Sequence, residues 1–208
     1  MDHASLADRL LDVIEQDLAA LTRRRITEKG DKVFGAAILR KSDLSLVVAE
    51  TNNETESPLW HGEMNAIRRF YELPRTERPD PRDCLFLATH EPCSLCLSGI
   101  TWSGFDNFYY LFSYEETRDV FAIPHDIRIL REVYAVADPD REAPAPRRDY
   151  YNRSNAFFQS HGLTTIIAGL DRGTKERLVE RVDNLTALYA ELSAFYQATK
   201  AQSGILLS

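Results

Sequence analysis

The sequence predicts a three-layer α/β/α sandwich around a mixed β-sheet, followed by a helical C-terminal extension. The first observation is the order of periodic segments along the chain: helix, two strands, helix, strand, helix, strand, helix. The second is that a short turn separates the first two strands, which predicts an antiparallel hairpin. The third is that later strands are linked through helices, so the sheet should be mixed and covered on both faces.

Each element is predicted from its own pattern. Helices are expected where apolar residues recur at spacings of three and four, and strands where apolar runs are bounded by turn residues. The expected elements are helix 4–24, strands 32–40 and 44–49, loop 52–58, helix 61–73, strand 84–88, helix 93–103, strand 108–112, helix 115–121, and a strand or helix over 127–133.

The chain divides at a proline-rich stretch. Residues 1–137 are expected to form the main domain, residues 138–149 a linker containing three prolines, and residues 150–208 a helical extension packed on the domain. Within the extension, a heptad-like seam indicates either a helix packed on its own domain or a dimer interface. The seam consists of Leu178, Val182, Leu185, Tyr189, Leu192 and Tyr196.

Composition limits the partners and the compartment. The net charge of -7 argues against a nucleic-acid-binding protein, which usually presents a basic surface. No apolar run approaches the roughly 20 residues of a membrane helix, and no secretory signal is recognisable. Three cysteines cannot all pair, and two of them form a Cys-x-x-Cys, so we expect a cytoplasmic protein with metal or redox chemistry.

Two short motifs carry the chemistry. One is a His-x-Glu at residues 61–63, and the other is a Pro-Cys-x-x-Cys at residues 92–96. Either motif alone arises by chance, but the two in this order, each at the start of a predicted helix, form the signature of zinc-dependent base deaminases.

The residue types suit a catalytic zinc ion. His61, Cys93 and Cys96 supply three nitrogen and sulfur ligands, and a catalytic zinc leaves its fourth position for water. The two cysteines lie three residues apart on one helical turn, where the helix N-terminus favours thiolates. Glu63 is near enough to reach that water without being a ligand, so it is the expected proton carrier.

Other interpretations of these motifs make different demands. A structural zinc would require a fourth protein ligand, for which Cys84, His90 and His125 are the nearby candidates. A thioredoxin-like redox role would leave His61 and Glu63 unexplained.

At these residues the chain resembles the cytidine deaminase superfamily, in particular the branch of guanine deaminase, yeast-type cytosine deaminase and tRNA adenosine deaminases. The resemblance covers about residues 1–135 and includes the Phe-Gly-Ala at 34–36, the Asn-Asn at 52–53, and the run 99–103. It implies the cytidine deaminase-like fold, one Zn²⁺ per chain and a homodimer. It also implies substrate contacts from Asn53, Asn52, Gly35, Ala36 and Trp60, with Phe34 and Trp102 as further candidates for an apolar wall.

The chain departs from the branch around the pocket. Ser-Pro-Leu at 57–59 replaces the usual Asp-Pro-Thr, and Gly62 stands where alanine is usual. These changes bear on the identity of the substrate more than on the chemistry.

The sequence therefore predicts a hydrolase acting on C–N bonds of cyclic amidines, which releases ammonia from a free nucleobase or nucleoside, with guanine or cytosine favoured. One alternative is a tRNA adenosine deaminase, which would need a basic surface around the pocket. The other is a non-catalytic zinc-stabilised interaction module, which would need a blocked fourth zinc position.

Overall fold

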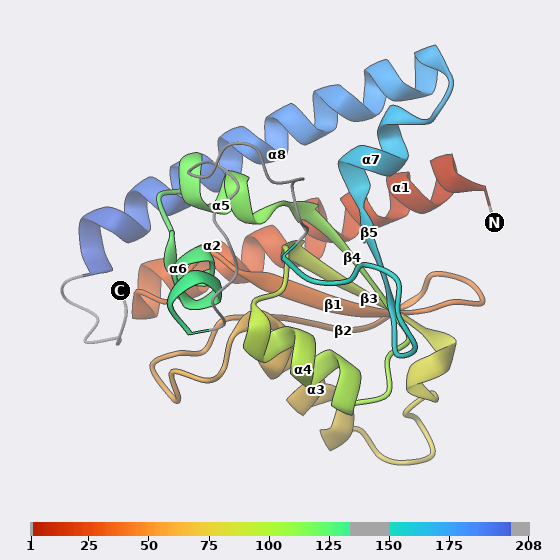
Figure 1. Cartoon of the computed structure of the whole chain (residues 1–208), viewed down its shortest axis with the longest axis horizontal. Helices are drawn as coiled ribbons and strands as arrows, with labels where there is room; N and C mark the ends of the chain where they lie inside the picture. Colours follow the sequence, from red (N-terminus) through yellow and green to blue (C-terminus); the bar gives the residue numbers. More distant parts are fainter. Residues whose placement is uncertain (1, 134–149, 201–208) are drawn as a thin grey trace.

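The computed structural model describes residues 2–133 and 150–200, so the predicted linker at 138–149 lies outside the described residues. A five-stranded sheet in the order β2-β1-β3-β4-β5 forms the middle layer (Figure 1). Its strands are β1 (Gly35–Arg40), β2 (Leu46–Thr51), β3 (Cys84–His90), β4 (Asn107–Phe112) and β5 (Gln159–Gly162).

Strand directions confirm the predicted mixed sheet. β1 pairs antiparallel with both β2 and β3, whereas β3–β4 and β4–β5 are parallel. The hairpin turn is longer than its sequence suggested, because Leu44 adopts a left-handed conformation with φ of 58° and Asp43 accepts from the Ser45 amide. β2 therefore starts at Leu46 instead of residue 44.

Helices cover both faces of the sheet (Figure 1). The first face carries an almost continuous N-terminal helix and the last two helices: α1 (His3–Asp12), a π-helical turn (Val13–Leu18), α2 (Ala19–Lys29), α7 (Leu163–Ala168) and α8 (Arg172–Thr199). The second face carries α3 (Gly62–Glu72) and α4 (Ser94–Trp102). A 3₁₀ turn (Pro81–Asp83) precedes β3, and α5 (Tyr114–Asp119) and α6 (His125–Glu132) follow β4.

The alternation of side chains along β1 separates two apolar cores. Ala37 and Leu39 face the core beneath α1, α2 and α8, while Ala36 and Ile38 face the core beneath α3 and α4. This is the two-face burial that a covered sheet requires. The three-layer α/β/α sandwich predicted from the sequence is therefore confirmed.

The C-terminal segment is not purely helical. Residues 159–162 of the predicted helical extension form the edge strand β5, and Gly162 is the N-cap residue of α7. β5 pairs with β4 through the register Asn107 to Gln159 and Tyr110 to Gly162. The polar Gln-Ser-His-Gly sequence gives no strand periodicity, and pairing with an existing strand determines its conformation.

The heptad-like seam packs within the chain. α8 contacts α1 and α2, and most seam residues are buried in the first core. The buried members are Leu178, Leu185, Tyr189, Leu192 and Tyr196. This is the intramolecular packing that was one of the two interpretations of the seam. Within the described residues, no helix combines the length and apolar character needed to span a bilayer.

Candidate metal-centred active site

Three potential metal ligands come from the N-terminal ends of two helices on the same face of the sheet. His61 is the N-cap residue of α3, Cys93 is the N-cap residue of α4, and Cys96 lies in the first turn of α4. A side chain from outside the helix stabilises the first turn of α3: the Gly62 amide donates a hydrogen bond to Oδ1 of the buried Asn52 over 2.6 Å. Local capping therefore places the His61 ring opposite the two thiols.

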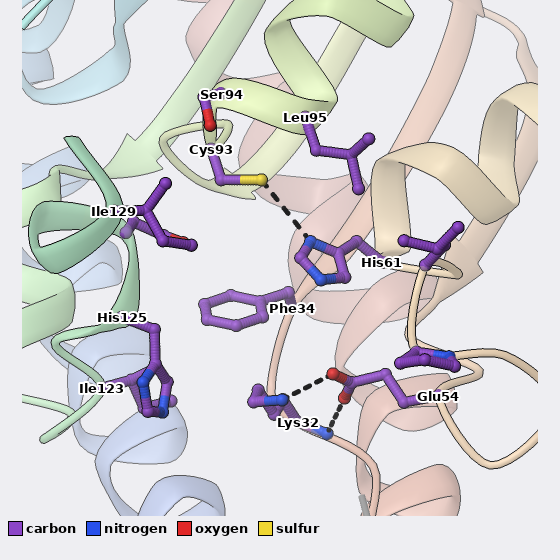
Figure 2. A pocket seen from close by; sticks show the side chains of 13 residues that line it. Lys32, Phe34, Glu54, His61, Cys93, Ser94, Leu95, Ile123, His125 and Ile129 are labelled. Atoms are coloured by element: carbon purple, nitrogen blue, oxygen red, sulfur yellow. Dashed lines mark hydrogen bonds and ion pairs between the residues drawn. The ribbon is translucent and has the colours of Figure 1, made fainter. Parts of the chain in front are cut away.

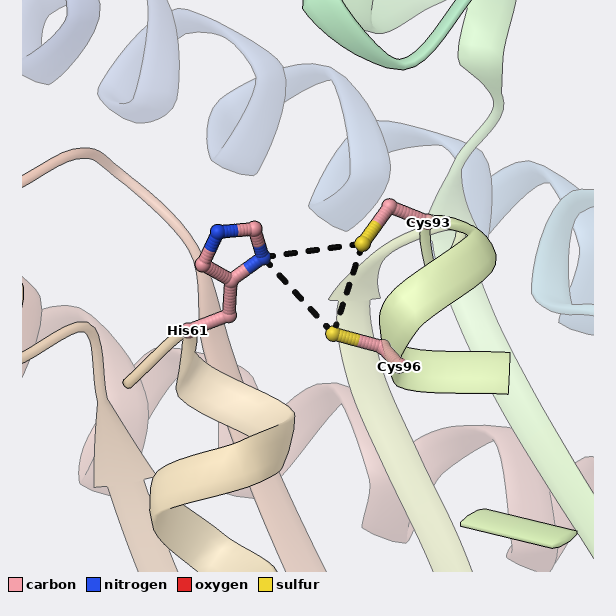
Figure 3. A group of neighbouring side chains, drawn as sticks. All are labelled: His61, Cys93 and Cys96. Atoms are coloured by element: carbon pink, nitrogen blue, oxygen red, sulfur yellow. Dashed lines mark hydrogen bonds between the residues drawn. The ribbon is translucent and has the colours of Figure 1, made fainter. Parts of the chain in front are cut away.

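The three ligand atoms form a nearly equilateral triangle (Figure 3). Nδ1 of His61 lies 3.6 Å from Sγ of Cys93 and 3.7 Å from Sγ of Cys96, and the two sulfurs are 3.6 Å apart. A tetrahedral zinc, with Zn–S of about 2.3 Å and Zn–N of about 2.0 Å, would separate such ligands by about 3.5–3.8 Å. The donor set and its spacing therefore fit one zinc ion.

Within residues 2–133 and 150–200, the group of possible ligands consists of these three residues alone. The candidates for a fourth ligand lie elsewhere: Cys84 is buried at the start of β3, and His90 is enclosed by aromatic rings behind the site. His125 lines the same cavity as His61 without joining the group. A zinc ion held by these three residues would keep its fourth position open.

The electrostatics of the triangle suit a cation. Hydrogen bonds with Cys96 and His61 lower the pKa of Cys93 well below its ordinary value, whereas burial raises the pKa of Cys96. Burial disfavours the imidazolium form of His61, but its contact with Cys93 outweighs burial and raises the pKa of His61 to about 9. These shifts favour a Cys93 thiolate beside a protonated His61 ring, and a metal ion bound to the three residues would displace the protons on Nδ1 of His61 and on the Cys96 thiol.

Glu63 lies beside the triangle in the first turn of α3. Its side chain is buried, it forms a hydrogen bond with Cys96, and it is not one of the three grouped ligands. Burial, reinforced by the negative charge of Cys93, raises the pKa of Glu63 to about 7. A carboxyl group with this pKa can both accept and donate a proton near neutral pH.

A cavity of about 510 Å³ opens onto His61 and Cys93 (Figure 2). Its volume is in the usual range for small-molecule sites. Most of its lining is apolar, and its ionisable residues besides the two ligands are Lys32, Glu54, His125 and Asp126. The lining residues are Lys32, Phe34, Glu54, Pro58, Leu59, His61, Cys93, Ser94, Leu95, Ile123, His125, Asp126 and Ile129.

The two asparagines predicted to bind substrate make contacts within the protein. Asn52 is fully buried, and its Nδ2 donates to Glu54 over 2.9 Å. Asn53 accepts from Arg25 and donates to Glu56 over 2.5 Å. Neither residue lines the cavity, so Asn52 acts here by fixing Gly62, and a direct contact with substrate stays a prediction.

The other predicted contacts divide between the cavity and its surroundings. Phe34 lines the cavity, whereas Gly35 and Ala36 lie in β1 behind it. Gly62 packs so closely on β1 that a Cβ atom there would lie 3.0 Å from the Phe34 carbonyl oxygen. Trp60 lies outside the lining, with the Arg68 guanidinium 5.1 Å from its ring centroid.

Trp102 is not part of the predicted apolar wall of the pocket. It ends α4 with 91% of its surface exposed and does not line the cavity. Leu59, Leu95 and Ile129 supply apolar wall where the sequence had suggested Trp102.

Sequence reasoning missed a polar part of the cavity. Lys32 and Glu54 form a buried ion pair in its lining, and burial raises the pKa of the nearby Asp126 carboxyl well above its ordinary value. These residues come from the segment before β1, the loop after β2 and α6, and no short motif links them. The available signal was a charged residue, Lys32, close before the apolar run that forms β1.

Comparison with known proteins relates this site to one family. Residues 12–112 match the cytidine and deoxycytidylate deaminase zinc-binding region. Guanine deaminase of Bacillus subtilis (strain 168) is 35% identical over 72 residues, which are 34% of this chain and 44% of that protein. The match thus spans less than half the length of that relative.

Solved structures of similar proteins were also found. An X-ray structure of guanine deaminase from Bacillus subtilis has 23% identity and a TM-score of 0.49, covering 72% of this chain and 87% of that one. A structure of guanine deaminase from Nitrosomonas europaea has 15% identity and a TM-score of 0.48, covering 85% of this chain and 81% of that one.

Proposed function

Because the chain belongs to the cytidine deaminase superfamily, we propose that it is a zinc-dependent hydrolytic deaminase of free nucleobases or nucleosides, with guanine or cytosine as the favoured bases. The reaction would replace an exocyclic amino group of a cyclic amidine by a carbonyl oxygen and release ammonia. His61, Cys93 and Cys96 would hold the metal, and Glu63 would transfer the protons.

One observation carries this proposal. Three ligand atoms lie 3.6 to 3.7 Å apart beside the buried carboxyl group of Glu63, and two of the ligand residues, His61 and Cys93, line a cavity of small-molecule size. A structural zinc site would close its fourth position with a protein ligand. Among the described residues no fourth ligand joins the group, which supports catalysis over a zinc-stabilised interaction module.

Zinc bound to these residues would acidify a water molecule and so supply the nucleophile. The chain's own part is to move protons. The Glu63 carboxylate would accept a proton from the nucleophile and pass it to the ring nitrogen. It would then accept a second proton from the newly added hydroxyl group and pass it to the leaving amine, so that the carbonyl forms as ammonia departs. The pKa of about 7 that burial gives Glu63 suits this double role, because neither protonation state is strongly favoured near neutral pH.

The cavity walls would orient and enclose the base. Phe34 and the aliphatic residues Leu95 and Ile129 present apolar surface to a flat ring. Guanine is favoured as a substrate because of the local similarity to a guanine deaminase, and cytosine because of the family resemblance. A cytoplasmic location is part of the proposal, since the site needs reduced thiols. So is a homodimer, which analytical ultracentrifugation would test.

An ammonia-release screen tests the proposed function. Zinc-loaded and chelator-stripped protein would be assayed with cytosine, guanine, adenine and their nucleosides. We expect ammonia from at least one free base or nucleoside with the zinc-loaded protein and none after stripping. Activity confined to adenosine in tRNA would replace the proposed substrate class, and no ammonia from any substrate at full zinc occupancy would refute the proposal.

A further inference from the structure

The cavity contains a hydrogen-bond donor for which the metal-centred chemistry has no use. Lys32 and Glu54 lie across the Phe34 ring from Cys93 (Figure 2). Nζ of Lys32 is 2.6 Å from Oε1 of Glu54, and both side chains are almost completely buried, with exposures of 7% and 1%. An ion pair removed from water in this way needs further hydrogen bonds to be satisfied.

The two partners of this pair differ in their remaining capacity. The Glu54 carboxylate already accepts hydrogen bonds at both oxygens. Oε1 accepts from Nζ of Lys32, while Oε2 accepts from the Lys32 amide and from Asn52. The Lys32 ammonium has three protons, and one of them goes to Glu54. Across the residues that the structure describes, no second acceptor is hydrogen-bonded to Nζ. Lys32 therefore presents a donor to the cavity, and Glu54 has little acceptor capacity left.

The charge of the surroundings indicates what kind of acceptor fits. Lys32 and Glu54 cancel each other, and the neighbouring Arg25 is paired with the buried Asp31 over 2.5 Å. Burial, together with the charge of Lys32, lowers the pKa of His125, which favours the neutral form of its ring. A phosphate or carboxylate placed here would be a buried charge without a matching cation, whereas a neutral oxygen would not.

Resting on the proposed function, we propose that Lys32 is a substrate-binding residue that donates a hydrogen bond to a ring carbonyl oxygen of the base. The substrates are then neutral oxo-amino heterocycles, in which the amino group lies at the metal centre and the oxo group at Lys32. The Glu54 carboxylate holds the ammonium in place and keeps this end of the cavity electrically neutral. Rings that lack the oxo group leave the buried ammonium with an unmade hydrogen bond and are rejected.

Matched pairs of substrates isolate the oxo group. 2-Aminopurine is guanine without its oxo group, and 4-aminopyrimidine is cytosine without its oxo group. A site that hydrogen-bonds a substrate group rejects the analogue lacking it strongly, so we expect wild-type kcat/KM to favour the oxo-bearing member of at least one pair by about 100-fold or more.

The variant that tests Lys32 must not leave Glu54 as a buried unpaired charge. Lys32→Met/Glu54→Gln removes both charges together and should reduce the preference for the oxo-bearing ring at least tenfold. The matched control is Arg25→Met/Asp31→Asn, which removes the adjacent ion pair outside the cavity lining and should keep the preference. An unchanged preference in Lys32→Met/Glu54→Gln would overturn the proposal.

Two further measurements separate the possible failures. Calorimetry on the zinc-loaded Glu63→Gln protein compares the binding of guanine and 2-aminopurine without turnover, so it tests Lys32 even if ammonia release fails. We expect weaker binding of 2-aminopurine and loss of that difference when Lys32→Met/Glu54→Gln is added. Assays with dCMP and GMP test whether the site prefers a charged group. If the wild type preferred these phosphates to the free bases, and if Lys32→Met/Glu54→Gln lost that preference, the assignment of Lys32 to a neutral oxygen would be overturned.

Discussion

The chain brings a histidine and a glutamate close together twice, with opposite results. His61 and Glu63 lie at the start of α3, where His61 lines the cavity, whereas His90 is the last residue of β3 and Glu91 follows it. Both glutamates are buried, with residue exposures of 5% and 3%. The difference between the pairs lies in what surrounds them.

The first pair keeps its chemical capacity. Nδ1 of His61 faces two sulfurs, and the Glu63 carboxyl contacts the thiol of Cys96. Their contacts are therefore with groups that a metal ion would bind.

The contacts of the second pair are structural. Oε1 of Glu91 accepts from the Tyr151 hydroxyl over 2.6 Å and lies 3.1 Å from the Arg153 guanidinium, while Oε2 accepts from the Tyr114 amide. His90 bonds to Thr89 and is surrounded by aromatic rings. Glu91 thus connects the C-terminal segment to the loop before Cys93. The two pairs have the same residue types, so the difference in their contacts comes from the neighbouring residues: potential metal ligands around the first pair, and tyrosine, arginine and aromatic side chains around the second.

The largest expected effect is on catalysis at Glu63. Glu63→Gln keeps the size of the side chain but removes the proton acceptor, so kcat should fall by about 10³-fold while zinc content stays at one per chain. Steady-state ammonia release and metal analysis of the same preparation measure both quantities. Full activity in this variant would mean that another group moves the protons. The pair His61 and Glu63 would then differ less in role from the pair His90 and Glu91 than the structure indicates.

The second prediction concerns His90 and pH. Burial lowers the pKa of His90 from 6.5 to about 3, so the unfolded chain binds a proton more readily than the folded one. Stability is therefore lost as the pH falls from 6.5 towards 3, and His90 alone should cost about 3 kcal/mol between pH 6.5 and 4. Urea unfolding of the wild type and His90→Asn across this range measures the difference. Parallel pH profiles for the two proteins would show that His90 is protonated within the fold.

The third prediction tests the structural role of Glu91. Arg153→Met leaves the Glu91 carboxylate buried without its cation, and because the Arg153 side chain is 35% exposed we expect a loss of about 2 kcal/mol of unfolding free energy. Adding Glu91→Gln should restore part of it. The exposed pair Lys41–Asp106 provides the control, since Lys41→Met should cost less than about 1 kcal/mol. Equal losses from both single variants would contradict a special role for Glu91.

The smallest expected effect is that of one hydroxyl group. Tyr151→Phe removes a hydrogen bond to the buried Glu91 while keeping the ring, so unfolding free energy should fall by about 1 to 2 kcal/mol. The zinc-loaded variant should keep its kcat, because Tyr151 contacts Glu91 and not the cavity. A large fall in kcat with little loss of stability would move the second pair into the catalytic machinery.

Short-range patterns were the predictable part of this molecule. Helix geometry predicted that Cys93 and Cys96, three residues apart, face the same point. His61 lies 32 residues from Cys93, and its place beside them was predicted from the pair of motifs that marks zinc-dependent base deaminases. The hairpin and the helices on both faces were predictable from periodicity.

Features that depend on residues far apart in the chain were not predictable. The Lys32–Glu54 pair joins positions 22 residues apart, and only the packing of the loop after β2 against β1 creates it. β5 is a polar edge strand whose conformation comes from pairing with β4, and Glu91 meets Tyr151 from 60 residues away. In each case tertiary contacts decide the role, and the local sequence does not identify the partner residue.

Zinc titration of the metal-stripped protein tests the central claim most directly. Zinc is added stepwise, and the initial rate of ammonia release from the best free base or nucleoside is recorded at each step, with Cys96→Ser as the control. The rate should rise linearly and level off at one zinc per chain, with little rise in Cys96→Ser. A protein that binds one zinc at His61, Cys93 and Cys96 and yet releases no ammonia from any base or nucleoside would contradict the account.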